Sequence, residues 1–189
     1  HVLARALELT PDRIRVVVGN GADAVRDSLP AGVETVLQER QRGTGDAVGC
    51  ALGGLDRDAV VLVLYGDVPL VQRSTLSSLV EAAGVADCAL LTADRDQPDG
   101  YGRIVRDATG SIERIVESDD ATAAERAITE INTGLLAMDA GSLRAHVAEL
   151  DCDNRQGEYY LTDVIARVRA AGGRVRAVQA QYEWEVEGV

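Results

Sequence analysis

The sequence predicts an α/β domain built on a mostly parallel, doubly wound central sheet. Short runs of β-branched and aliphatic residues alternate with segments whose apolar residues recur at the helical period. Residues 60–64 (VVLVL) are apolar without alternation, which is typical of a strand buried on both faces of a parallel sheet. The chain has 189 residues, enough to bury one sizeable core. We therefore expect a single domain, with residues 60–64 as its central strand.

The first part of the chain alternates regularly between helix and strand. Gly19, Asn20 and Gly21 close the first apolar run as a turn, and Pro30 ends the helix that follows. In order, we expect helix, strand, helix, strand and helix over residues 2–9, 14–18, 22–29, 33–37 and 47–55. Strands and helices at this spacing indicate a parallel, doubly wound sheet.

Beyond the central strand the alternation changes. Residues 74–85 predict a helix with Ser74 as its N-cap, and residues 88–93 predict a buried strand. Two short strands over 103–106 and 111–117 flank a turn, so we expect a β-hairpin that acts as a lid or flap. In order, we expect helix, strand, helix, helix and strand over residues 120–127, 128–138, 140–150, 161–171 and 175–181.

Composition excludes several classes of protein. The net charge of −12 would repel a nucleic-acid backbone, and no apolar run approaches the roughly 20 residues that cross a bilayer. Cys50, Cys88 and Cys152 are odd in number and widely spaced, which argues against a disulfide framework or a zinc site. The chain begins at His1 without a signal sequence, so we expect a piece of a longer protein.

Asp67 is a candidate metal ligand. It follows the predicted central strand directly after Tyr65 and Gly66, and the carboxyl ends of parallel strands face the ligand crevice. A single carboxylate there suits Mg²⁺, whose other ligands can be substrate phosphates. The alternative is a simple turn, because glycine and aspartate are common in turns.

Further polar residues suggest a site elsewhere in the chain. Gly43 and Thr44 before a helix could bring backbone N–H groups close to a nucleotide, or could form only a helix-start turn. Gly102 follows an aromatic residue at the mouth of the hairpin and could let a sugar ring approach the backbone, or could simply make a tight bend. Glu117 and Asn132 lie at strand ends or in apolar strands, where a polar side chain needs a partner or a ligand.

Six ordered motifs resemble one family. They are Gln38 with GTG (43–45), LYGDVPL (64–70), GYGRIVR (100–106), EINTG (130–134), QGEYYLTD (156–163) and EVEGV (185–189). Together they resemble the uridylyltransferase domain of the bacterial bifunctional enzyme that makes UDP-N-acetylglucosamine. The resemblance implies a Rossmann-like nucleotidyltransferase fold in a cytoplasmic protein of cell-wall precursor synthesis. It also implies that UTP and N-acetylglucosamine 1-phosphate react, with Mg²⁺, to UDP-N-acetylglucosamine and pyrophosphate.

The same resemblance implies roles for particular residues. The uracil contacts would be Gln38, Gly43 and Thr44. The residues along the nucleotide sugar would be Tyr65, Gly66 and Asp67, with Asp67 also on Mg²⁺. The N-acetylglucosamine unit would be held by Gly102, Glu117 and Asn132, and its phosphate end lined by Tyr160 and Thr162. The alternative for the segment that contains Tyr160 and Thr162 is a helix N-terminus packed by aromatic side chains.

The chain also departs from the family pattern. The usual LGTGHA contains Arg42 and Asp46 here, and Asp119 replaces an expected lysine. The family's glycine-rich loop and second metal ligand, and the C-terminal β-helix through which its trimers form, lie outside this sequence. We therefore expect the chain to be inactive by itself. Two alternatives stay open: another sugar-1-phosphate nucleotidyltransferase, or a non-catalytic module that binds nucleotide sugars.

Overall fold

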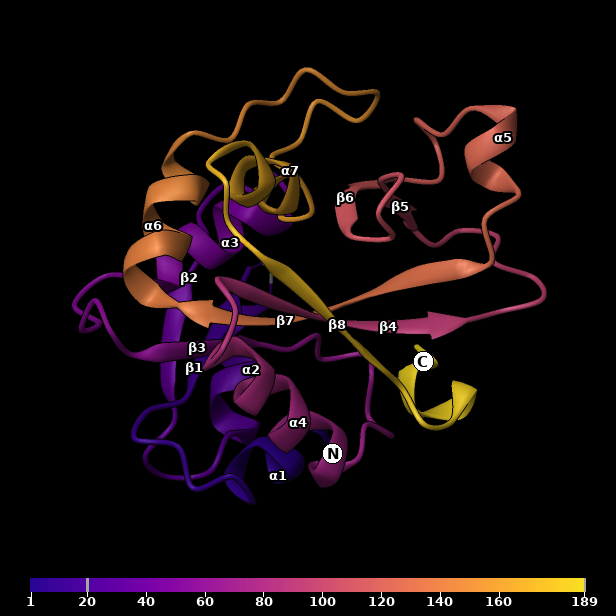
Figure 1. Ribbon diagram of the computed structural model, residues 1–189. Coiled ribbons are helices and arrows are strands. Elements are labelled where there is room, and N and C mark those ends of the chain that lie inside the picture. The colour runs from indigo at the N-terminus through magenta and orange to yellow at the C-terminus, as the bar shows by residue number, and fades with distance from the viewer. Residues whose placement is uncertain (20, 189) are drawn as a thin grey trace.

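A six-stranded sheet lies at the centre of the fold (Figure 1). The computed structural model describes residues 1–19 and 21–188, so Asn20 of the predicted turn and Val189 of EVEGV lie outside the described residues. The strands are β3 (Val60–Val63), β4 (Cys88–Asp94), β5 (Arg103–Arg106), β6 (Ile112–Val116), β7 (Glu130–Asp139) and β8 (Val175–Gln179). Their order is β6-β5-β7-β4-β8, and β3 pairs with β7 outside this path.

The α/β class is confirmed, but this sheet is mixed rather than mostly parallel. Strand β7 runs antiparallel to β3, β4 and β5, and β5 runs antiparallel to β6. Among the described strands of this sheet, β4 and β8 form the only parallel pair. The cause is the path of the chain after β4, which turns back through the predicted hairpin and re-enters between β3 and β4. A parallel pair would require a crossover to the opposite end of the sheet.

Strand β3 is less buried than its sequence predicts. Val60 is 46% exposed, and the next three residues are only half-buried. In the part of the chain that the structure describes, β3 pairs with β7 alone. The centre of the sheet is instead β7 with β4, both of which are almost entirely buried. The expectation of a central strand buried on both faces was wrong, since an unbroken apolar run does not identify its neighbours.

A second, smaller sheet lies in the N-terminal part of the chain. Strands β1 (Arg15–Val18) and β2 (Glu34–Leu37) make a parallel two-stranded sheet. Helix α3 (Thr44–Ala51) packs against both strands, and Arg26 of α2 (Ala22–Ser28) donates from Nε to Thr35 Oγ1 of β2 at 3.3 Å. Leu9, just after α1 (Val2–Leu7), packs against a core of the main sheet instead. The predicted succession of helix, strand, helix, strand and helix is confirmed here, although α3 begins at Thr44 rather than at residue 47.

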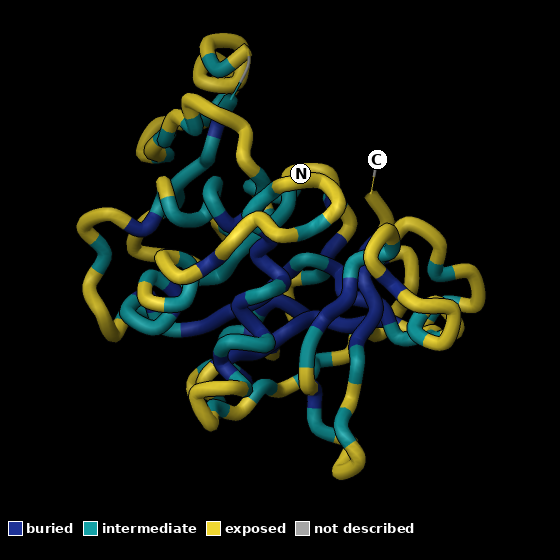
Figure 2. Tube along the Cα trace, turned by 90° about the horizontal axis from the view of Figure 1, so that it is seen from above, coloured by how far each residue is buried: buried dark blue, intermediate teal, exposed yellow. Residues whose placement is uncertain are grey.

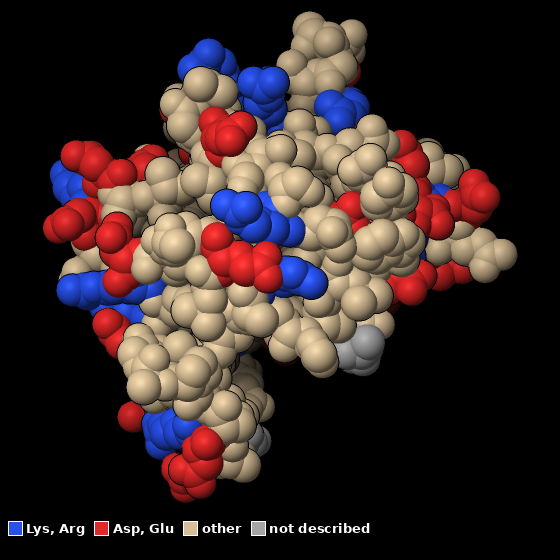
Figure 3. Space-filling model, turned by 90° about the horizontal axis from the view of Figure 1, so that it is seen from below, with Lys and Arg blue, Asp and Glu red and all other residues tan. Residues whose placement is uncertain are grey.

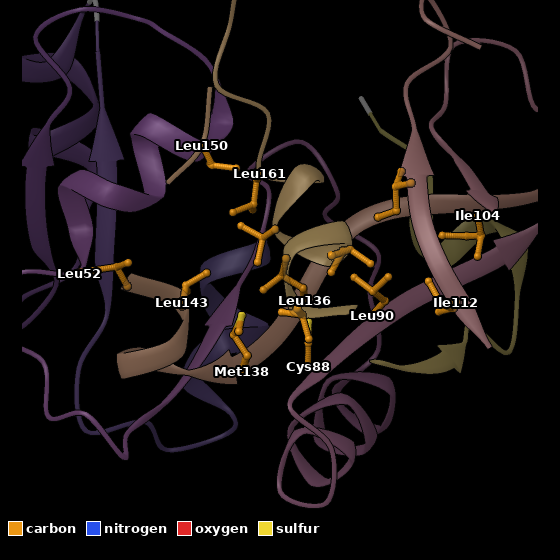
Figure 4. Close-up of a cluster of buried hydrophobic side chains, with 14 residues drawn as sticks. Leu52, Cys88, Leu90, Ile104, Ile112, Leu136, Met138, Leu143, Leu150 and Leu161 are labelled. Atoms are coloured by element: carbon orange, nitrogen blue, oxygen red, sulfur yellow. The ribbon is translucent and has the colours of Figure 1, made fainter. Parts of the chain in front are cut away.

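Two apolar cores lie on opposite faces of the main sheet. One contains Leu90 and Leu136 and is covered by α3, α6 (Ala140–Ala148) and α7 (Asp163–Ala170) (Figure 4). The other lies under helix α4 (Arg73–Ala83) and contains Leu91 of β4 and Leu135 of β7, which are the sequence neighbours of Leu90 and Leu136. This division follows from the two-residue period of strand side chains. Figure 2 shows the buried residues gathered in the central strands, with exposed loops around them.

A remote carboxylate caps helix α4. The N-cap is Gln72 rather than the predicted Ser74, and its side chain makes no capping hydrogen bond. Glu185 lies in the short 3₁₀ helix η1 (Glu183–Val186), is 0% exposed, and accepts from the Gln72 backbone N–H at 3.3 Å and from Thr75 Oγ1 at 2.6 Å. Local sequence could not reveal this cap, because its acceptor is more than a hundred residues away.

The remaining helix, α5 (Ala123–Arg126), begins with a local capping box at Thr122. None of the described helices is long and apolar enough to span a membrane.

Candidate functional site

The candidate site lies where β3 ends and β5 begins along one edge of β7. Val63 pairs with Leu136 and Arg103 pairs with Ile131, so both strands use the same long partner. Two groups of residues, those that follow β3 and those that precede β5, are therefore brought to the middle of β7. Tyr65 comes from the first group, Gly102 from the second, and Asn132 and Gly134 from β7 itself.

Tyr65 lies directly against Gly134. A Cβ at Gly134 would come within 2.5 Å of the Tyr65 ring, and the backbone there has φ +85°, a conformation that favours glycine. Burial raises the pKa of the Tyr65 hydroxyl, the Thr44 side chain lowers it, and the carboxylates of Glu117 and Asp67 raise it further. Tyr65 is thus a half-buried ring with acidic groups on its polar side. The sequence analysis missed Gly134 as a site residue, although it ends the EINTG motif.

Asn132 and Gly102 face each other across the β5–β7 pair. The Asn132 backbone N–H donates to the Gly102 carbonyl at 2.8 Å, and Asn132 Oδ1 accepts from the Gly134 N–H at 3.2 Å. Asn132 is only 9% exposed. A Cβ at Gly102 would lie 3.3 Å from Glu117 Oε2, so the absence of a side chain keeps this carboxylate close to the backbone.

Glu117 joins the hairpin to the segment before α7. Its Oε1 accepts from Thr162 Oγ1 at 2.8 Å. Burial raises the pKa of Glu117, the hydrogen bond from Thr162 opposes this shift, and nearby aspartates including Asp163 add to it. Tyr160 is 9% exposed, and its hydroxyl is buried without a hydrogen-bond partner among the described residues. Such a hydroxyl can donate to a ligand oxygen.

The start of α3 packs against the segment before α7. Gly43 has φ +105°, and a Cβ there would lie 2.7 Å from the Tyr159 carbonyl oxygen. The Gly45 N–H donates to this carbonyl at 2.8 Å, and Thr44 Oγ1 accepts from the Leu161 N–H at 3.0 Å. The glycines of GTG therefore serve close packing against the QGEYYLTD segment, which places Thr44 near Tyr65.

Gln38 lies beside the start of α3. It is half-buried, and its Nε2 donates to Asp46 Oδ2 at 2.7 Å and to the Gly43 carbonyl at 3.2 Å. Asp46, one of the departures from the family pattern, is thus a direct partner of a predicted uracil contact. Asp119, another departure, is exposed and accepts from Gln156 Nε2 at 3.3 Å.

Asp67 and Gly66 are exposed just beyond β3. A Cβ at Gly66 would meet no described atom within 4 Å, so packing alone does not require glycine there. A Cβ at Gly188 would lie 3.7 Å from Asp67 Oδ2, which brings the EVEGV segment beside this carboxylate. The described residues contain no group of three or more His, Cys, Asp or Glu side chains that could hold a metal ion. A single carboxylate still fits Mg²⁺ if nucleotide phosphates complete the coordination.

Most of the predicted residues therefore form one connected neighbourhood. Contacts link the start of α3, Tyr65, the middle of β7, Gly102 and Glu117. A surface pocket of about 480 Å³ lies nearby between α3 and α6, but it is lined by residues such as Gly49, Val147 and Tyr159 and by none of the predicted substrate contacts. Figure 3 shows the lower face of the molecule, where acidic and arginine side chains are interspersed and an acidic group near the middle lies between two basic ones.

Comparison with known proteins identifies relatives along the whole chain. Residues 1–130 match the family described as the MobA-like NTP transferase domain. The chain is 51% identical over 190 residues to the bifunctional protein GlmU of Paraburkholderia phymatum, and 50% identical over 190 residues to that of Cupriavidus pinatubonensis. Each comparison covers 100% of this chain but 42% of the relative, so the chain spans less than half the length of these curated relatives.

A solved structure shows a similar fold. The crystal structure of HddC from Yersinia pseudotuberculosis superposes with a TM-score of 0.66 and covers 94% of this chain and 73% of that protein's chain. The sequence identity is 16%, so this likeness concerns the fold alone.

Proposed function

The chain belongs to the MobA-like NTP transferase family, and from that membership we propose that it is the nucleotidyltransferase part of a longer protein that makes UDP-N-acetylglucosamine. The nucleotidyltransferase fold expected from the motifs is confirmed by the family match. In the proposed reaction, UTP and N-acetylglucosamine 1-phosphate give UDP-N-acetylglucosamine and pyrophosphate. The half-identity to bifunctional GlmU proteins over the full chain supports this choice within the family.

One structural observation carries the proposal. Residues predicted to hold the sugar and its phosphate end come from four separate segments and lie together. Glu117 accepts a hydrogen bond from Thr162 and lies next to Gly102, which in turn pairs with Asn132. These carboxylate, hydroxyl and amide groups offer the donors and acceptors that sugar hydroxyls require.

The proposed chemistry is an in-line displacement at phosphorus. A phosphate oxygen of the sugar phosphate forms a bond to the α-phosphorus of UTP, and the bond from this phosphorus to the β-phosphate oxygen breaks. Pyrophosphate leaves with the electron pair of that bond. No covalent enzyme intermediate is needed, so the residues act by positioning the two substrates and by stabilising charge.

The residues divide this work by their positions. Thr44, held by Leu161, borders the nucleotide end of the site, while Glu117 and Asn132 orient the sugar. The unpartnered hydroxyl of Tyr160 can donate to an oxygen at the phosphate end. Nucleotidyltransferases generally use a divalent metal, and we propose Mg²⁺ on Asp67. Bound there, it would neutralise phosphate charge and leave the α-phosphorus more open to attack.

A non-catalytic module that binds nucleotide sugars is the second candidate. It is favoured by Asp119, which brings an exposed carboxylate close to Glu117 where the family pattern has a cation. A negative charge there would oppose the binding of phosphates. We propose the catalytic function because the half-identity to bifunctional GlmU proteins extends over the whole chain, and because Asp119 is exposed and hydrogen-bonded to Gln156. For the parent protein we further propose a cytoplasmic location and a homotrimer assembled outside this chain.

Pyrophosphate release tests the proposal. The complete protein is supplied with Mg²⁺, each of the four common nucleoside triphosphates, and the 1-phosphates of N-acetylglucosamine, glucose and mannose in turn. The proposal expects the fastest release with UTP and N-acetylglucosamine 1-phosphate. Faster release with another pair would assign a different sugar nucleotidyltransferase. Tight binding of UDP-N-acetylglucosamine without any release would support the binding module.

A further inference from the structure

The amide of Gln38 has both of its hydrogens occupied by the protein. Nε2 donates to Asp46 Oδ2 at 2.7 Å and to the Gly43 carbonyl oxygen at 3.2 Å. A carboxamide has two N–H donors and one carbonyl acceptor, and both of these partners can only accept. Any ligand that meets this side chain therefore finds the carbonyl oxygen, Oε1, rather than the amino group.

Asp46 is the residue that makes this orientation exclusive. Rotating the amide by half a turn would place Oε1 against a carboxylate oxygen and a carbonyl oxygen, which repel it. A carboxylate is well placed in the first turn of α3, because the positive end of the helix dipole favours negative charge. Without Asp46, the Gly43 carbonyl would accept one hydrogen of the Gln38 amide, and the other would be available to a ligand.

We propose that Asp46 is a positioning residue that fixes Gln38 as a hydrogen-bond acceptor and thereby selects uracil over cytosine. Position 3 of uracil carries an N–H, which can donate to Oε1, whereas position 3 of cytosine carries a lone pair, which Oε1 repels. This inference rests on the proposed function and on the uracil contact that the family resemblance predicts for Gln38. Asp46 departs from the family pattern, and in this proposal it contributes to nucleotide specificity rather than marking a lost activity.

The test compares UTP with CTP in the complete protein. We expect Asp46→Asn to lower the ratio of kcat/KM for UTP to that for CTP by about tenfold, because asparagine can accept or donate and so permits both orientations of Gln38. Asp46→Lys should lower the ratio further, since an ammonium group only donates and would attract Oε1. Direct binding of both nucleotides is measured by calorimetry alongside turnover.

Two further variants separate orientation from general damage. Asp23→Asn removes a carboxylate from the first turn of another helix, where its partner is the exposed Arg26 at 3.1 Å, and should leave the ratio unchanged. Adding Gln38→Glu to Asp46→Asn restores a side chain that only accepts, so the preference for UTP should return. A ratio within one variant does not depend on the fraction of folded protein.

The outcomes distinguish this inference from the proposed function. If wild-type protein uses UTP but both Asp46 variants keep its ratio of UTP to CTP in turnover and binding, the role of Asp46 is refuted and the function stands. If wild-type protein releases no pyrophosphate with any nucleotide, the proposed function fails. The binding ratios then still decide whether Asp46 controls the choice of base.

Discussion

Replacing Gly134 with alanine would place a methyl group against the ring of Tyr65. The backbone at Gly134 has φ +85°, and forcing an L-residue into this conformation costs about 1–2 kcal/mol. The new Cβ would also lie 2.5 Å from a ring carbon of Tyr65, and relieving such overpacking costs about 1–3 kcal/mol. We therefore expect Gly134→Ala to lower the free energy of unfolding by about 2–5 kcal/mol.

A second glycine provides a matched control. Gly110 has φ +82°, and a Cβ there would meet nothing within 4 Å. Gly110→Ala should therefore lose only the conformational part, about 1–2 kcal/mol. The difference between the two variants measures the contact with Tyr65.

Urea unfolding and ligand titration are the assays. Displacement of Tyr65 should also weaken the binding of UDP-N-acetylglucosamine in Gly134→Ala, whereas Gly110→Ala should bind as the wild type does. Equal losses of stability in both variants, with binding unchanged in both, would refute the packing of Tyr65 on Gly134 and its place in the site.

Substitutions at three other positions test two residues of the site and the cap of α4. Asn132→Ala should weaken UDP-N-acetylglucosamine binding by about 1–3 kcal/mol, as measured by calorimetry, and an unchanged affinity would make its role structural. Because burial raises the pKa of Glu117, the folded state holds this proton more tightly than the unfolded state, and stability should fall as pH rises above about 4 through the raised pKa. Glu117→Gln should flatten this part of the curve of unfolding free energy against pH; an unaltered slope contradicts the assignment. Glu185→Ala should lose about 2–4 kcal/mol by removing the cap of α4 and leaving the buried Thr75 hydroxyl unpaired. Glu185→Gln retains an acceptor and should lose less in the same urea titration, so equal losses would argue against the cap.

Local pattern predicted the elements of the fold but not how they pair. The helices and strands occur near their expected positions, because apolar periodicity and turn residues are local properties of the chain. The central place of β7 was not predicted, since it depends on which strands meet across long separations in sequence. The cap of α4 by Glu185 was missed for the same reason.

The site was predicted mainly from motifs, and the structure adds how its residues support one another. Position relative to the predicted strands singled out Asp67 and Asn132, but it could not show that Tyr65 lies on Gly134 or that Glu117 accepts from Thr162. These contacts join segments that are far apart in the chain. The roles of the individual residues toward substrate remain predictions that the variants above address.

Magnesium-dependent pyrophosphate release by the Asp67→Ala variant shows whether this carboxylate supports uridylyl transfer. The complete protein is assayed with UTP and N-acetylglucosamine 1-phosphate, beside Asp58→Ala, which removes an exposed carboxylate near the opposite end of β3. If this chain is a metal-dependent uridylyltransferase domain, wild type and Asp58→Ala release pyrophosphate, and Asp67→Ala does not at any Mg²⁺ concentration. Full release by Asp67→Ala would exclude Asp67 as the metal ligand, and no release by the wild type would exclude uridylyl transfer.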